Sequence, residues 1–318
     1  MFEQILGQEK AILQLKKFIA SGRVPPALLF HGVPGIGKAT AAKYFAMALN
    51  CTDTSARENN DACGYCQNCK NILQNTHPDF IFADFAYQAQ LTGKEVEKQQ
   101  RIGVDTIRSI TAKSQQKSVL GKYKVLVVDR AETMQSEAAN ALLKYIEEPP
   151  QNTIWVLISS KKDALLATIK SRSQALPFAP LKEEVVLEIL KSNGAVITPN
   201  MQKAARYSGG SISKAAGAAA LLDNIMSAGA DNPNFPYEVA SSLSKTLAEG
   251  RAEAQTILDM VAFGIHSLWS SEKDDGVKEE LKDKIEKVTY FKRAVNRNVS
   301  PQMVVETALM EVSDLKIF

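Results

Sequence analysis

The sequence predicts an α/β protein in which helices cover both faces of a parallel sheet and an all-helical region follows. Five short apolar segments alternate with helical segments as far as Pro180, a pattern typical of parallel sheets with crossover helices. A glycine-rich segment, HGVPGIGKAT (31–40), separates the first apolar segment from a helical one. After Pro180 no strand pattern remains, and apolar residues recur at helical spacing.

The expected strands are short apolar runs, and they cover residues 27–32, 79–85, 123–129, 153–159 and 174–178. Helices are expected between them at stretches of helical apolar spacing, within 1–24 and over 38–50, 104–116 and 136–148. The polar segment 91–103 is expected to be a surface loop.

Length and charge limit the class of protein. A chain of 318 residues is long for one core, and the changes of pattern near residues 180 and 228 suggest three domains. Lys and Arg number 38 against 35 Asp and Glu, and a net charge of +3 is too small to indicate nucleic-acid binding by itself. No apolar run approaches the ~18 residues of a membrane span, and the N-terminus lacks a signal pattern, so we expect a soluble cytoplasmic protein.

The glycine-rich segment has the spacing G-x-x-x-x-G-K of a phosphate-binding loop. Gly32, Gly35 and Gly37 allow backbone N–H groups to point at phosphate oxygens, and Lys38 would reach the outer phosphates. The strand before the loop and the helix after it favour a nucleotide site over an ordinary glycine-rich turn, which is the alternative.

The residues that would hold Mg²⁺ and activate water in such a site are only partly present. Asp129 ends an apolar strand, where a carboxylate that holds Mg²⁺ is expected. However, Ala39 replaces the Ser or Thr whose hydroxyl ligates Mg²⁺, and Arg130 stands where ATPases of this kind place the glutamate that activates water. Glu132 is expected to be a solvated residue at a helix start. The sequence therefore predicts a degenerate site that has lost hydrolysis and leaves binding of ATP and Mg²⁺ open.

All four cysteines fall within residues 51–69, at Cys51, Cys63, Cys66 and Cys69. They include two overlapping C-x-x-C pairs, and four thiolates close a tetrahedral structural zinc site. A disulfide framework would spread its cysteines along the chain, and unpaired thiols without metal are the remaining alternative. Binding of Zn²⁺ contributes roughly 10–16 kcal/mol in small zinc modules, enough to order a segment with little apolar material.

Together these motifs resemble the AAA+ clamp-loader family of bacterial DNA polymerase III, in its delta-prime type. The resemblance covers about the first 215 residues. The cysteine module and AANALLKYIEEPP are its most specific parts, and it also rests on GQEKAILQLKKFIASGRVPPALLFHGVPGIGK, HPDF, IGVDTIR, VLVVDRAE and IKSRSQ. It implies an AAA+ P-loop domain (1–179), a helical lid (180–228) and a helical collar (229–318) that assembles a five-subunit ring.

The resemblance also implies a division of labour. Gamma and tau subunits hydrolyse ATP, delta opens the sliding clamp, and the delta-prime type is a stator. The implied partners are gamma/tau and delta and, through them, the sliding clamp and primer–template DNA, with no membrane. Arg172, in Ser171-Arg172-Ser173, matches the family's arginine finger for a neighbouring subunit, and Lys214 matches its second sensor. The alternative is that Arg172 is an ordinary surface arginine.

Two other functions remain as alternatives. The chain is then either an active AAA+ ATPase motor of the gamma/tau type or a zinc-dependent binding module whose P-loop fold is only a scaffold. The C-terminal segment SDLKIF (313–318) is expected to pack against the helical collar.

Overall fold

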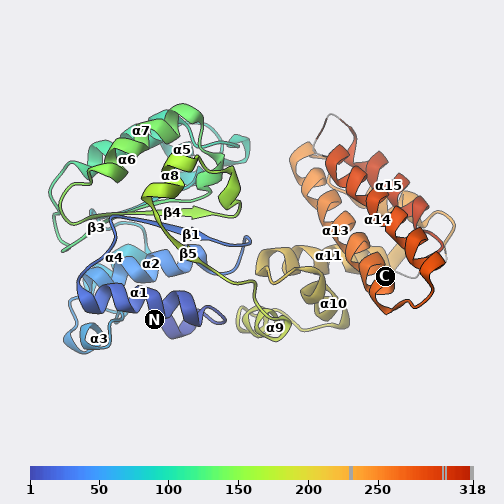
Figure 1. Cartoon of the computed structure of the whole chain (residues 1–318), viewed down its shortest axis with the longest axis horizontal. Helices are drawn as coiled ribbons and strands as arrows, with labels where there is room; N and C mark the ends of the chain where they lie inside the picture. Colours follow the sequence, from blue (N-terminus) through green and yellow to red (C-terminus); the bar gives the residue numbers. More distant parts are fainter. Residues whose placement is uncertain (229–231, 296, 298, 316–318) are drawn as a thin grey trace. The chain divides into compact units, whose positions relative to one another are not determined.

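In the computed structural model, helices cover both faces of a five-stranded sheet (Figure 1). The strand order is β2-β3-β4-β1-β5, and every neighbouring pair is parallel. The strands are β1 (Ala27–His31), β2 (Phe80–Ala83), β3 (Lys124–Val128), β4 (Thr153–Ser159) and β5 (Gln174–Pro177). Each expected strand is present, which confirms the predicted α/β class.

The structure describes residues 1–228, 232–295, 297 and 299–315. Their contacts divide the chain into two compact units, Met1–Leu181 and Lys182–Phe318. The sheet belongs to the first unit, and each unit is described separately below.

The central strands are buried along their whole length. Every residue of β3 and β4 is buried, including the charged Lys124 and the large Trp155. Strands buried on both faces need helices on both faces, because water is excluded from each side. Lys124 is accommodated because its Nζ donates hydrogen bonds to the carbonyls of Lys113 and Gln116, at 2.9 and 2.6 Å.

Two groups of helices supply this cover (Figure 1). One face carries α1 (Glu9–Ser21), α2 (Lys38–Asn50) and α4 (Gln67–Leu73). The other carries α5 (Phe85–Thr92), α6 (Val104–Ser114), α7 (Ser136–Glu147) and α8 (Ala167–Arg172). Short helical turns complete the unit: η1 (Phe2–Gln4), α3 (Thr54–Glu58), η2 (Val96–Lys98), η3 (Ala131–Thr133) and η4 (Lys162–Ala164).

Helix α5 corrects the sequence prediction for this stretch. The strand expected to reach residue 85 ends at Ala83, and the loop expected from residue 91 is preceded by a helix that ends at Thr92. Asp84 causes the change, because its side chain accepts a hydrogen bond from the Tyr87 N–H at 2.8 Å and caps the helix. Gly93 ends it in the left-handed conformation.

All the secondary-structure elements described in the second unit are helices. Its helices are α9 (Glu183–Ser192), α10 (Pro199–Tyr207), α11 (Ile212–Ala228), α12 (Phe235–Ser242), α13 (Leu247–Ser271), α14 (Asp275–Val295) and α15 (Pro301–Glu311). One buried apolar cluster joins α10 and α11 to α12 through α15. The segments expected to form a lid and a collar thus share a core, and their division at residue 228 stays a prediction. The last three residues of SDLKIF lie outside the described residues.

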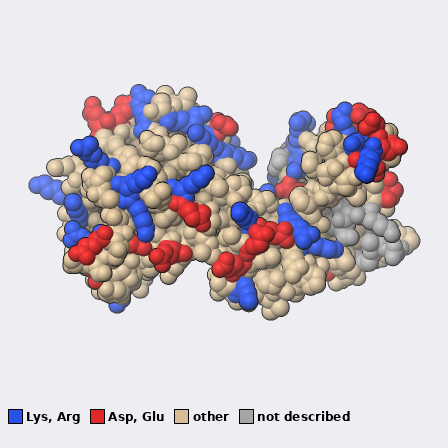
Figure 2. All heavy atoms as spheres, turned by 60° about the horizontal axis from the view of Figure 1, so that its bottom comes forward, with Lys and Arg blue, Asp and Glu red and all other residues tan. Residues whose placement is uncertain are grey.

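No helix in the described ranges is long and apolar enough to cross a membrane. On the face drawn in Figure 2, Lys and Arg side chains are interspersed with Asp and Glu. This face presents no broad field of one sign, in agreement with the small net charge.

A buried carboxylate explains the HPDF motif. Asp79 is fully buried just before β2, and its carboxylate accepts backbone N–H groups from Val119, Leu120 and Gly121 at 2.9, 2.8 and 2.7 Å. The Nδ1 of His77 accepts the Asp79 N–H at 3.0 Å. Because the loop held by Asp79 leads directly into β3, this carboxylate holds the start of the strand that Asp129 follows.

We expect Asp79→Ala to lower the free energy of unfolding by about 3 kcal/mol or more, because three backbone N–H groups would lose their side-chain acceptor. Asp84→Ala, which removes only a helix cap, should cost about 1 kcal/mol. Urea unfolding of the two variants measures the difference. Equal losses would contradict the anchoring role of Asp79.

Candidate functional site

The phosphate loop joins β1 to α2 in a geometry that only glycine permits at two positions. Gly32 has φ 152°, and a Cβ there would lie 2.4 Å from the Phe178 carbonyl oxygen. Gly37 has φ 94° and begins α2 without a side-chain cap. The first N–H groups of α2 therefore have no capping side chain and can bind an anion at the positive end of the helix dipole. Gly35, with φ 69°, completes the turn.

Lys38 lies inside this loop. Its side chain is buried, and its Nζ donates hydrogen bonds to the carbonyl oxygens of Gly32 and Val33, each at 2.6 Å. Burial lowers the pKa of Lys38, while the charges of Asp129 and Glu132 act in the opposite direction. If the loop bound a phosphate, the Lys38 Nζ would donate to phosphate oxygens in place of the Gly32 and Val33 carbonyls.

Asp129 stands at the carboxyl end of β3, and its N–H donates to the Ala83 carbonyl at 3.0 Å. Burial raises the pKa of its carboxyl group, against the effects of the Arg130 N–H and the Arg130 charge. Arg130 has φ 50° and places its guanidinium 5.0 Å from the centre of the Phe85 ring. A guanidinium cannot accept a proton from water, so Arg130 supplies no general base.

Glu132 differs from its expected role as a solvated residue. Its Oε1 accepts hydrogen bonds from the Ser160 N–H, at 3.1 Å, and from the Ser160 hydroxyl. Its Oε2 is buried and has no hydrogen-bond partner among the described residues. Glu132 therefore ties the turn after β3 to the end of β4. Sequence reasoning missed the contact because nothing in the local pattern pairs two turns that follow separate strands.

Ala39 supplies no oxygen ligand, so the first turn of α2 lacks the hydroxyl that holds Mg²⁺ in complete phosphate loops. Lys38, Asp129 and Glu132 do interact electrostatically at the carboxyl edge of the sheet. The site combines a phosphate cradle and two carboxylates with no complete metal or base machinery. Nucleotide binding at these residues stays a prediction.

The four cysteines meet at one point. Their Sγ atoms all lie within 4.8 Å of one another, and the Cys63 and Cys69 sulfurs are 3.9 Å apart. None forms a disulfide. Zinc–sulfur bonds of 2.3 Å in a tetrahedron place sulfurs about 3.8 Å apart, so the donor set and its spacing fit one Zn²⁺. Burial raises the pKa of the Cys51 and Cys69 thiols, and a bound cation would favour their thiolate forms.

Arg172 makes polar contacts with residues of α7 and α8. It ends α8, and its Nε is 2.5 Å from Oε1 of Glu147 at the end of α7. The side chain is 41% exposed, so a guanidinium at this position is accessible to a second molecule. In the second unit, Lys214 pairs with Asp259 at 3.0 Å.

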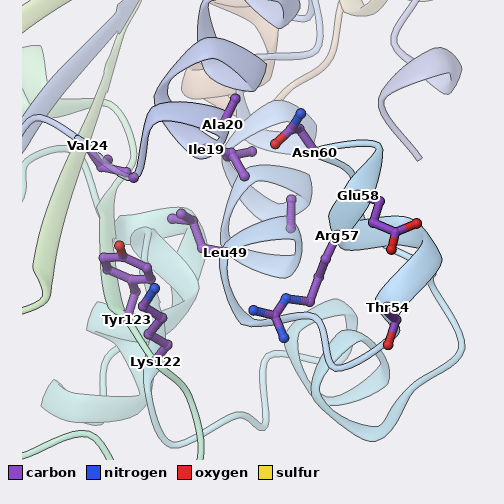
Figure 3. Close-up of a pocket in the computed structure, with 12 residues that line it drawn as sticks. Ile19, Ala20, Val24, Leu49, Thr54, Arg57, Glu58, Asn60, Lys122 and Tyr123 are labelled. Carbon is purple, nitrogen blue, oxygen red and sulfur yellow. The ribbon is translucent and has the colours of Figure 1, made fainter.

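A cavity of about 480 Å³ lies beside the cysteine module (residues 51–69), and Arg57 of α3 extends into it (Figure 3). Ile19, Val24 and Leu49 give it apolar walls, and Lys122 and Tyr123 lie across from Arg57. None of its lining residues belongs to the phosphate loop. It is therefore distinct from the nucleotide site.

The strand order, the phosphate loop after β1 and the aspartate after β3 define an AAA+ P-loop fold. A solved structure of this class, a DNA polymerase III gamma-subunit-related protein from Thermotoga maritima, superposes with a TM-score of 0.55 at 14% identity. The superposition covers 96% of this chain and 99% of that one. At this identity the likeness establishes the fold alone.

A family model described as "DNA polymerase III, delta subunit" matches residues 7–182. The chain belongs to this family, in its delta-prime clamp-loader type. It is 40% identical over 153 residues to the delta' subunit of Pseudomonas aeruginosa, and 31% identical over 196 residues to that of Bacillus subtilis. These matches cover 48% and 62% of this chain and 43% and 54% of those proteins.

The gamma/tau subunits are also relatives. That of Mycobacterium bovis is 29% identical over 189 residues, which make up 59% of this chain and 30% of the relative. The matched region thus spans about a third of the gamma/tau relatives and about half of the delta-prime ones. The predicted family is confirmed by these matches, and the family model covers nearly all of the unit that carries the sheet.

We expect metal analysis of the purified chain to return about one Zn²⁺ per molecule, because four thiolates complete one coordination shell. Cys63→Ser should lower the zinc content and the melting temperature together, since metal binding contributes to folding. Ser55→Ala, on the same segment but outside the cysteine cluster, is the control. A metal-free chain with unchanged stability in Cys63→Ser would contradict the zinc site.

Proposed function

We propose that this chain is a stator subunit of a DNA polymerase III clamp loader, one that does not hydrolyse ATP at its own site. The observation that carries the proposal is the contrast between two sites. The phosphate loop keeps its glycines and Lys38 but has Ala39 and Arg130 in place of the metal ligand and the base. Arg172 is exposed on the surface of the same unit, and its polar contacts are to Glu147, Thr168 and Ser171.

Arg172 would act in trans on ATP held by a neighbouring subunit. A fixed guanidinium near the transferring phosphate stabilises the negative charge of the transition state, and in well-studied cases it contributes about 10³–10⁵ in rate. The partially exposed position of Arg172 supports this role, because a finger must reach beyond its own subunit. The similarity to gamma/tau subunits supports a subunit of that type as the one that would receive it.

The proposed partners are gamma/tau-type subunits and delta, with the sliding clamp and primer–template DNA reached through the assembled complex in the cytoplasm. The zinc module, in this proposal, orders the segment that follows α2 and has no part in catalysis. The proposed collar would supply contacts for the ring.

The second candidate is an active motor subunit. The observation that favours it is the pair of carboxylates, Asp129 and Glu132, near Lys38. A purified chain should show no Mg²⁺-dependent ATP turnover if the stator proposal holds, because neither the metal hydroxyl nor the base is present. Turnover that disappears in Lys38→Ala would overturn that proposal and identify a motor.

For the assembled complex, we expect Arg172→Ala to lower ATP turnover by the partner ATPase by about 10³-fold or more. Assembly should persist, since the side chain is exposed and its ion pair lies within one unit. Arg206→Ala removes another exposed, ion-paired arginine and is the control. Size-exclusion chromatography confirms assembly before turnover is measured. Wild-type turnover in Arg172→Ala would exclude this residue from the mechanism.

A further inference from the structure

The guanidinium of Arg172 is held along one edge. Its Nε pairs with Oε1 of Glu147 at 2.5 Å, and its Nη1 donates to the Thr168 carbonyl at 3.3 Å and to the Ser171 hydroxyl at 3.4 Å. Its Nη2 makes no hydrogen bond to any residue that the structure describes. The Glu147 carboxylate therefore makes an ion pair at the Nε edge, and the opposite end of the fork has no hydrogen-bond partner among these residues.

The contact joins two separate elements. Glu147 is the last residue of α7, and Arg172 is the last residue of α8. Thr168 and Ser171 belong to the same helix as Arg172, so Glu147 is the contact that relates the guanidinium to a second helix. Both α7 and α8 contribute buried residues, Ile146 and Ile169 among them, to one apolar cluster. Glu147 thus lies at the end of a helix that is packed against the core.

The ion pair between Glu147 and Arg172 lies at the surface, so it does not stabilise the fold by being buried. The side chains of Glu147 and Arg172 are 45% and 41% exposed. Exposed ion pairs contribute little to folding, because water screens the attraction and two long side chains lose freedom. The contact does restrict the orientation of a flexible arginine, and orientation matters most where a group acts on a transferring phosphate.

We infer that Glu147 is a positioning residue for Arg172. This inference rests on the proposed function, in which Arg172 acts on ATP of a neighbouring subunit. Glu147 holds the guanidinium at its Nε edge, so that Nη2 can donate to a phosphate oxygen of the neighbouring subunit's ATP. The carboxylate itself touches no nucleotide. Glu148, the next residue, is also exposed but has no ion-pair partner among the described residues, so it does not share this role.

The test uses the complex assembled from this chain and its ATPase partners. In Glu147→Gln, the carboxylate charge is lost at nearly constant shape, and we expect kcat for ATP to fall by about 10-fold with KM unchanged. The loss should be smaller than in Arg172→Ala, because Thr168 and Ser171 still contact the guanidinium. Glu148→Gln is the matched control and should turn over ATP at the wild-type rate.

A double-mutant cycle separates positioning from an independent structural effect. If Glu147 acts through Arg172, then Glu147→Gln combined with Arg172→Ala should be no slower than Arg172→Ala alone. Additive losses would overturn the inference, and so would wild-type or faster turnover in Glu147→Gln. These outcomes are distinct from failure of the proposed function, which would appear as unchanged turnover in Arg172→Ala itself.

Discussion

Burial of the central strands on both faces is the constraint on which the rest of the first unit depends. Every residue of β3 and β4 is buried, so polar groups on these strands must be paired inside or displaced to the strand ends. Parallel strands all end at the same edge of the sheet. Asp129 after β3, Ser160 after β4 and the phosphate loop after β1 therefore gather at one edge, where side chains from distant sequence positions interact.

Side-chain hydrogen bonds to the backbone hold the segment that leads into β3. Asp79 binds the loop at residues 119–121, and Asn50 exchanges two hydrogen bonds with the backbone of Tyr123, at 2.9 and 3.0 Å. Asn50 ends α2 immediately before Cys51, the first residue of the cysteine cluster. One short segment thus connects the helix that follows the phosphate loop, the entry to β3 and the cysteine cluster.

The strands and the phosphate loop could be predicted from the sequence because their signals are local. An apolar run of five to seven residues between turns determines a buried strand, and glycine spacing determines a loop. Helix α5 escaped prediction because Asp84 follows the apolar run directly, and its capping role depends on backbone geometry rather than on apolar spacing. The Glu132 contact with Ser160 escaped for another reason. It joins residues far apart in sequence, and only the parallel order of β3 and β4 places them together.

Contacts within the first unit hold the phosphate loop in shape independently of any bound nucleotide. The amide of Gln8, a buried residue before α1, donates to the Ala179 carbonyl at 2.8 Å and accepts the Ala179 N–H at 3.0 Å. It also contacts the Ile36 carbonyl, at 3.4 Å, within the loop. Gly32 meanwhile packs against the Phe178 carbonyl. The loop is thus a structural joint between the N-terminal segment, α2 and the end of β5. Ala39 and Arg130, which stand in place of a metal ligand and a base, take no part in this joint, because none of its hydrogen bonds involves either side chain.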